Sequence, residues 1–212
     1  MSMRVLVVSD IHSDEAAAVA ASLIENPDVV LDCGDHDRIK TYFDAAPHFY
    51  IYGNHVPRKI EISPDDFPFP IKVQAGQIYE FRMGKEVLRF GGIDGHYSRR
   101  WHPYAVKKED VALLSQIPEK SLDVFLTHES PLQVYRESGE VMHLASQVLS
   151  EIRRIKPRIV FSGHLNHYVV RDPGDGIKYV ELDNIGRGYV ILRKEGEELT
   201  LERKLRVFGK QP

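Results

Sequence analysis

Residues of the types that bind metal ions follow five apolar runs of this sequence. They are Asp10 with His12, Asp35, Asn54 with His55, His128, and His164 with His167. In open α/β sheets the loops at the carboxyl ends of the strands converge on one crevice, so we expect these scattered side chains to meet. Taken singly, Asp35 or Asn54 is explained as well by a turn, where Asp and Asn are common. Histidine is not a typical turn residue, however, and four of the five sites contain one.

The mixture of carboxylate, imidazole and amide groups indicates the kind of metal site. These ligands suit manganese, iron or zinc, whereas a structural zinc site would recruit thiolates. Even without His55, seven candidates remain, which are too many for one ion. Two ions about 3.5 to 4 Å apart form a clamp for in-line displacement at phosphorus, so the pattern predicts phosphoester hydrolysis. We expect manganese first, with iron, zinc or nickel as the alternatives.

The apolar runs before these residues have the composition of buried strands, and other segments have helical periodicity. Strands are expected at residues 4–9, 29–33, 48–52, 122–126 and 159–161, and helices at 15–24, 39–45 and 141–155. Short strands at 71–73, 78–82 and 87–90 should pair antiparallel, as should those at 168–171, 178–182, 189–193 and 199–205. A loop is expected at 57–70, and 91–108 is irregular. The economical arrangement is an α/β fold in which two sheets share one core between flanking helices, a four-layer sandwich.

The composition limits what kind of protein this chain can be. Its 212 residues, 42% of them hydrophobic, fit a single globular domain over residues 1–212. No apolar run approaches the roughly 20 residues of a membrane helix, so we expect no membrane partner. The single cysteine, Cys33, and a start without a basic n-region predict a cytoplasmic location. The net charge of -3 gives no general attraction to nucleic acid, so no stable nucleic-acid complex is expected.

Five short motifs match the signature of a known family in both order and spacing. They read SDIHS at 9–13, CGDHD at 33–37, YGNHV at 52–56, LTHES at 126–130 and SGHLNH at 162–167. This succession of DxH, GD, GNH, a lone His and GHxH resembles the calcineurin-like metallophosphoesterases. It spans Asp10 to His167, about three quarters of the chain. The resemblance implies the four-layer α-β-β-α sandwich, with two mixed sheets flanked by helices.

The resemblance also implies roles for the matching residues. Asp35 would bridge the two ions, and His55 would be the acid catalyst that protonates the leaving oxygen or stabilises the phosphoryl charge. A hydroxide that bridges the ions would attack from the opposite side. The first ion would take Asp10, His12 and the distal histidine, and the second would take Asn54, His128 and His164.

One departure from the family pattern affects the acid catalyst. Val56 stands where the family usually has an acidic residue, so His55 lacks its usual orienting partner. Either another carboxylate, such as Asp94 or Glu129, takes that place, or the imidazole is less basic and catalysis is weaker.

A second departure affects the distal histidine, because the last motif is one residue longer than GHxH. A small bulge would bring His167 to the ligand position, and without the bulge Asn166 would occupy it and bind its metal more weakly. We favour His167, because imidazole binds divalent ions better than an amide oxygen does. The histidines not assigned to the metals, His36, His48 and His143, are expected to be structural, with a supporting position behind the ligands as the alternative for His36.

The loop that starts at His96 combines bases with aromatic side chains, at Tyr97, Arg99, Arg100, Trp101, His102 and Tyr104. This composition suits stacking on a base and pairing with phosphate, so a nucleotide is one candidate substrate. A solvated basic loop is an equal alternative.

Together these features predict a metal-dependent hydrolase of phosphate esters. Phosphodiesters are favoured over phosphomonoesters, because the GNH motif retains its histidine as a leaving-group acid. The rival prediction is a non-catalytic interaction subunit on the same fold, since Val56 and the altered GHxH motif both depart from the pattern.

Overall fold

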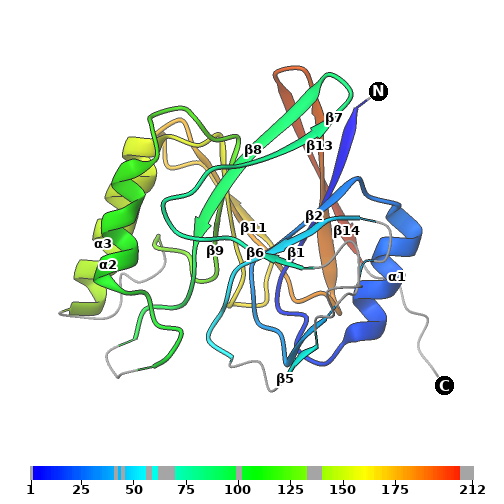
Figure 1. The fold of residues 1–212 in the computed structure, drawn as a ribbon, viewed down its shortest axis with the longest axis horizontal. Helices are drawn as coiled ribbons and strands as arrows, with labels where there is room; N and C mark the ends of the chain where they lie inside the picture. The colour runs from blue at the N-terminus through cyan, green and yellow to red at the C-terminus, as the bar shows by residue number, and fades with distance from the viewer. Residues whose placement is uncertain are drawn as a thin grey trace.

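Two six-stranded mixed sheets lie face to face, and helices cover their outer faces (Figure 1). The computed structural model describes residues 2–40, 43, 46–55, 59–61, 70–98, 102–132 and 140–205. The four layers agree with the predicted α/β sandwich.

The first sheet is parallel over four strands and antiparallel over the other two. Its order is β14-β13-β1-β2-β4-β6, and β13 runs antiparallel to both β1 and β14. The strands are β1 (Met3–Val8), β2 (Val29–Asp32), β4 (His48–Tyr50), β6 (Ile71–Lys72), β13 (Gly188–Glu195) and β14 (Glu198–Leu205).

The second sheet has a parallel centre and antiparallel edges. Its order is β11-β12-β10-β9-β8-β7, in which the edge strands β11 and β7 run antiparallel to their neighbours. The strands are β7 (Tyr79–Met83), β8 (Glu86–Ile93), β9 (Val124–Thr127), β10 (Ile159–Ser162), β11 (Val169–Arg171) and β12 (Lys178–Glu181). A separate parallel pair joins β3 (Arg38–Lys40) to β5 (Lys59–Glu61).

The helices lie on opposite sides of the two sheets, as Figure 1 shows. They are α1 (Glu15–Glu25), α2 (Lys108–Leu113), α3 (Glu140–Ile155) and a 3-10 turn at Leu114–Gln116. α1 begins after Asp14, whose Oδ1 accepts a hydrogen bond from the backbone N–H of Ala17 at 3.2 Å. α1 ends at Asn26, which adopts the left-handed conformation that often terminates helices. None of the helices described here is long and apolar enough to span a bilayer.

Alternation along the strands builds three apolar layers. Val5 and Val7 of β1 face the core between the sheets, while Leu6 and Val8 face the layer beneath α1. In β9 the pattern is the same, because Leu126 faces the central core while Phe125 contacts the layer that contains α3. Strands buried on both faces become nearly continuous apolar runs, which is why the sequence pattern located them.

Three expectations about individual elements were wrong. Residues 39–45 were expected to be helical, but residues 39 and 40 belong to the strand β3, whose backbone pairs with β5. Of the rest of that range only Phe43 is described, and it is not helical. Residues 71–73 were expected to pair antiparallel with the next strands, but β6 pairs parallel with β4, through Phe49 and Tyr50. The segment between β6 and β7 contains a turn, closed by the N–H of Gln77 on the carbonyl oxygen of Gln74 at 3.3 Å, and it carries the chain from one sheet to the other. The predicted loop at 57–70 was wrong over Lys59–Glu61, which form β5, and most of the remainder lies outside the described residues.

Candidate metal centre

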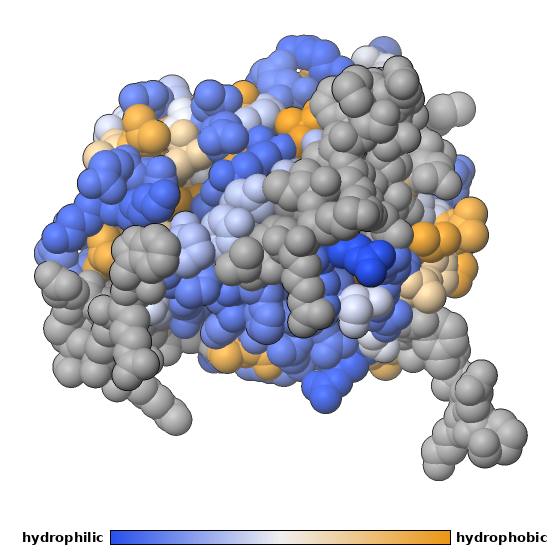
Figure 2. Space-filling view, turned by 60° about the horizontal axis from the view of Figure 1, so that its bottom comes forward, coloured by the Kyte–Doolittle hydropathy of each residue, from blue (hydrophilic) through white to orange (hydrophobic). Residues whose placement is uncertain are grey.

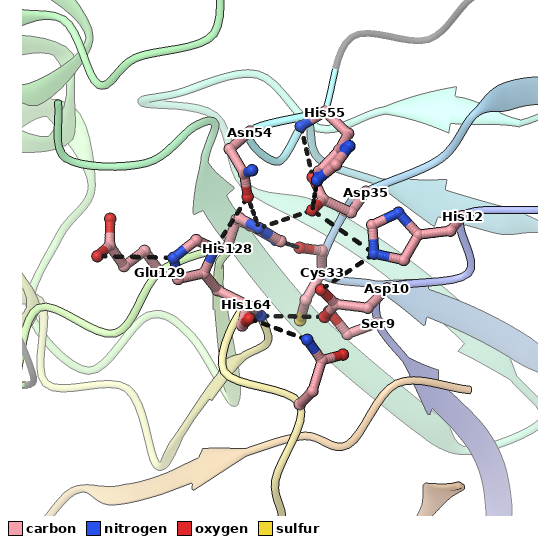
Figure 3. Close-up of polar contacts among 12 residues, drawn as sticks. Ser9, Asp10, His12, Cys33, Asp35, Asn54, His55, His128, Glu129 and His164 are labelled. Carbon is pink, nitrogen blue, oxygen red and sulfur yellow. Dashed lines mark hydrogen bonds and ion pairs between the residues drawn. The ribbon is translucent and has the colours of Figure 1, made fainter. Parts of the chain in front are cut away.

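The predicted ligands follow the carboxyl ends of parallel strands and converge from both sheets. β1, β2 and β4 lead to Asp10, Asp35 and Asn54, while β9 and β10 lead to His128 and His164. Figure 3 shows these side chains pointing toward one another around Asp35. Figure 2 turns the lower side of Figure 1 toward the viewer and shows a mainly hydrophilic surface in its middle.

Asp35 lies where two groups of candidate ligands overlap. The ligand atoms of Asp10, Asp35 and His128 lie within 4.8 Å of one another, as do those of His12, Asp35 and His55. Asp35 Oδ2 is 3.3 Å from His128 Nε2 and 4.0 Å from His12 Nε2. His12 Nε2 also lies 3.8 Å from Asp10 Oδ1. A carboxylate in this position can serve both halves of a two-ion centre.

The amide of Asn54 joins the two histidines of the second sheet. Its Oδ1 lies 2.9 Å from His128 Nε2 and 2.9 Å from His164 Nδ1. The other ring nitrogen of His128, Nδ1, lies 2.8 Å from the carbonyl oxygen of Cys33, which fixes the direction of the ring. One amide oxygen and two imidazole nitrogens therefore converge on one point, and this donor set suits a divalent ion.

Backbone and hydroxyl donors orient the two carboxylates. The N–H of His55 donates to Asp35 Oδ1 at 2.9 Å. The N–H of His164 and the hydroxyl of Ser9 both donate to Asp10 Oδ2, at 3.0 and 2.6 Å. Each carboxylate is thus held through one oxygen, while its other oxygen faces His12. The remaining oxygen of each carboxylate therefore has a fixed direction, and hydrogen bonds of this kind orient metal ligands in proteins.

Four predicted ligands have left-handed backbone conformations, although none of them is glycine. Their φ angles are 52° at Asp10, 46° at His12, 65° at Asp35 and 72° at His164. Such residues are uncommon outside glycine and cluster at functional sites. Gly53 allows the loops to meet, because a Cβ there would lie 2.0 Å from Asp35 Oδ1.

The charges of the cluster favour a bound cation. Burial alone would lower the pKa of His128, but hydrogen bonding to Asp35 and the nearby carboxylate charge raise it to about 9. Burial would raise the pKa of Asp35, yet His128 and the N–H and charge of His55 hold it well below the usual value. The buried carboxylate of Asp35 is thus paired with a proton on His128, and a metal ion can take the place of that proton.

The structure does not bring His167 into the cluster, contrary to the ligand set we favoured. Its Nε2 lies 3.2 Å from Glu181 Oε2, and its Nδ1 lies 3.1 Å from the carbonyl oxygen of Leu165. Asn166 behaves differently, because its Oδ1 is buried and has no hydrogen-bond partner in the described part of the chain. No bulge of the kind we expected redirects His167, since Asn166 adopts a left-handed turn with φ 54° instead. A buried acceptor without a donor is costly, and a metal ion would satisfy it.

His55 projects over the centre from the loop after β4. Its side chain is 53% exposed, its Nε2 lies 3.9 Å from Asp35 Oδ2, and its ring is 4.7 Å from that of His12. The proposed substitute Asp94 pairs with Lys72 and accepts a hydrogen bond from the N–H of Tyr52. Val56 lies outside the described residues. The other candidate, Glu129, lies 4.0 Å from His164 Nε2 and accepts a hydrogen bond from the N–H of Tyr97. In the described part, Asp35 is the carboxylate found within 4 Å of the His55 ring nitrogen.

A buried network that the sequence indicated only through His36 lies at the end of β2, close in sequence to Asp35. Asp32 Oδ2 lies 2.7 Å from His36 Nε2 and 3.1 Å from His48 Nε2, and its Oδ1 accepts the N–H of Gly34 at 2.9 Å. All three side chains of the network are almost fully buried. The sequence feature that could have revealed this network is Asp32, a charged residue at the end of an apolar strand.

A two-sheet sandwich that delivers carboxylates, an amide and imidazoles to one cluster can hold two metal ions, as metal-dependent phosphoesterases do. The family described as calcineurin-like phosphoesterase matches residues 3–168, so the chain belongs to that family.

Individual relatives agree with this assignment. A protein of Mycoplasma pneumoniae named "Probable metallophosphoesterase" is 40% identical over 132 residues, which are 62% of this chain and 70% of that protein. The structure of TT1561 from Thermus thermophilus superposes with a TM-score of 0.60 at 14% identity, covering 95% of this chain and 99% of that one. A dimetal phosphatase from Danio rerio gives 0.57 at 11% identity, with coverages of 97% and 96%. The two structural matches demonstrate a shared fold.

Proposed function

We propose that the protein hydrolyses phosphodiesters, and phosphomonoesters more slowly, with two divalent ions at the cluster around Asp35. The observation that carries this proposal is the convergence of ligand types from both sheets, with Asp35 common to two groups. When bound, the ions would polarise the phosphoryl oxygens and lower the pKa of the attacking water. Manganese is our first choice, and iron, zinc and nickel are the alternatives.

The ligands divide between the ions according to the contacts described above. Asp35 would be shared, and the second ion would take Asn54, His128 and His164, whose donor atoms converge. The first ion would take Asp10 and His12. We assign its remaining position to Asn166, because of the unpartnered Oδ1, and no longer to His167.

His55 would act on the leaving group. Its exposed ring stands beside the cluster and can reach an ester oxygen of a bound substrate. Protonation of that oxygen in the transition state is general acid catalysis, which typically contributes about 10² to 10⁴ in rate. Alkyl esters benefit most, because an alkoxide is a poor leaving group without a proton.

A substrate screen tests the proposal. The purified protein, loaded with manganese, would be assayed on a chromogenic diester, a matched monoester, a linear dinucleotide and cyclic nucleotides. We expect the diesters to be hydrolysed fastest, and His143→Ala, an exposed change on α3, to leave the rates unchanged. A metal-loaded wild type without activity on any of these esters would favour the non-catalytic interaction subunit.

The role of His55 predicts a dependence on the leaving group. For His55→Ala we expect a loss of about 10² or more on an alkyl diester, whose leaving oxygen needs a proton. The loss should be much smaller on a nitrophenyl diester, whose leaving group departs as an anion. Rates measured over a series of leaving groups check this, and equal losses across the series would rule out the acid role.

A further inference from the structure

His96 is held between two loops that carry candidate ligands. The N–H of Gly95 donates to the carbonyl oxygen of Tyr52, in the loop that leads to Asn54, at 2.8 Å. On the other side, the N–H of Tyr97 donates to Glu129 Oε2, next to His128, at 2.6 Å. The backbone around His96 is therefore tied to both sheets beside the metal centre.

A second set of hydrogen bonds joins the backbone of His96 to residues 104–106, farther along the same loop. Its N–H donates to the carbonyl oxygen of Tyr104 at 3.2 Å, and its own carbonyl accepts the N–H of Val106 at 3.0 Å. Gly95 is required here, because its φ is 93° and a Cβ would lie 2.1 Å from the Tyr104 oxygen. The ring of His102 packs edge-on against that of His96, with centroids 4.7 Å apart. The imidazole is thus preorganised.

The two ring nitrogens of His96 have different surroundings. Nδ1 is buried and has no hydrogen-bond partner among the described residues, while the ring as a whole stays partly exposed. A buried N–H without an acceptor costs more than a buried lone pair, so the ring proton is expected on Nε2. Nε2–H is then the group available to a ligand.

The electrostatic setting keeps this ring neutral. Burial, followed by repulsion from His102, His164 and His128, lowers the pKa of His96 to about 4, although Asp35 opposes the effect. At neutral pH the ring of His96 is uncharged. Its one N–H can donate a hydrogen bond but is too weak an acid to protonate a leaving oxygen, which is the role proposed for His55.

We propose that Nε2–H of His96 donates a hydrogen bond to a non-bridging oxygen of the phosphoryl group at the metal centre. The inference rests on the proposed function and names a substrate-binding residue for it. The backbone hydrogen bonds of Gly95 and His96 hold this donor in place. It would stabilise charge on the phosphoryl oxygens without breaking or forming a covalent bond.

The test compares His96→Ala with His96→Gln, whose side-chain amide places an N–H near the position of Nε2. The exposed His143→Gln serves as the matched control. Two readouts are needed: the dissociation constant of inorganic phosphate from the manganese-loaded protein, by calorimetry, and the metal content, by elemental analysis. For His96→Ala we expect phosphate to bind about 10-fold or more weakly, with unchanged metal content. His96→Gln should recover most of the binding.

The kinetic signature differs from that of an acid catalyst. In His96→Ala, kcat/KM should fall by about 10- to 100-fold, and by the same factor for good and poor leaving groups. A wild type that binds phosphate but hydrolyses no ester would refute the proposed function, while weaker phosphate binding by His96→Ala would still support this inference. Unchanged phosphate affinity in His96→Ala, or a loss of metal that accounts for the weaker binding, would overturn it, as would a wild type that binds no phosphate.

Discussion

Asp35 combines three properties that rarely occur in one carboxylate. It is almost fully buried, it adopts a left-handed backbone conformation, and it belongs to two of the groups of candidate ligands among the described residues. One of its oxygens is held by the N–H of His55, so the other faces the cluster in a fixed direction.

Asp35→Asn tests the shared position directly, because it removes the charge and keeps the shape. We expect the metal content to fall from two ions per chain to at most one, since a neutral amide cannot hold two cations close together. Hydrolysis should slow by roughly 100-fold or more, the scale on which loss of one charge-stabilising group acts. Elemental analysis and a steady-state assay check this, with circular dichroism to confirm folding. Retention of both ions would contradict the bridging role.

Asn166 and His167 offer a second comparison between neighbouring residues. Asn166→Ala should weaken the binding of one ion by about 10- to 100-fold, the usual range for groups that hold or orient a metal. His167→Ala should change the affinity little, because both ring nitrogens of His167 have partners outside the cluster. Metal titrations of the two variants decide the matter, and the reverse order of effects would restore His167 as the ligand.

At the scale of elements, β2 does more than deliver Asp35. Its last residue, Asp32, accepts hydrogen bonds from two buried imidazoles and from the turn at Gly34. Burial alone would raise the pKa of Asp32, but His36 and His48 hold it well below its usual value. The carboxylate is therefore charged, and the network depends on it.

Asp32→Asn should destabilise the protein by about 3 kcal/mol, because removing one partner of a buried charge network typically costs about 3 to 5 kcal/mol. Asp28→Asn is the control. Asp28 accepts a neutral backbone N–H, from Arg4, in place of two buried imidazoles, and a change there should cost about 1 kcal/mol or less. Urea unfolding measures both values. Equal effects of the two substitutions would show that the imidazoles contribute nothing.

The sequence predicted most elements because buried strands leave apolar runs, and the candidate ligands follow those runs. β8 shows why His96 was undervalued. Gly91 and Gly92 interrupt the apolar pattern, so the strand was expected to end at Phe90, although it continues to Ile93. Gly92 is required by contact with the neighbouring strand, since a Cβ there would lie 2.7 Å from the Leu126 oxygen. Such contacts cannot be read from the sequence, and neither can the turn that directs His167 toward Glu181.

For the whole molecule, the division of ligands between the sheets has energetic consequences. The first sheet supplies the carboxylates and the amide, and the second supplies His128 and His164, so bound ions would connect the two halves of the central core. We therefore propose that the described sandwich unfolds as one domain.

Removal of metal should lower the stability of the entire fold. A ligand that binds only the native state at about 100 times its Kd contributes about 2.7 kcal/mol per site. We expect a chelator to lower the melting temperature, manganese to restore it, and calorimetry to show one transition in both states. Two separate transitions, one for each sheet, would contradict both the single domain and the cross-sheet connection.

The left-handed residues at four ligand positions have a further consequence. Each of them bends the chain out of the extended conformation within a few residues of a strand end, so the side chain leaves the strand direction there. The position of each metal-binding atom is then set by the strand and by the left-handed residue that follows it. It does not depend on the length of the segment that comes next. Insertions or deletions in the crossovers between strands can therefore accumulate while the geometry of the centre stays constant.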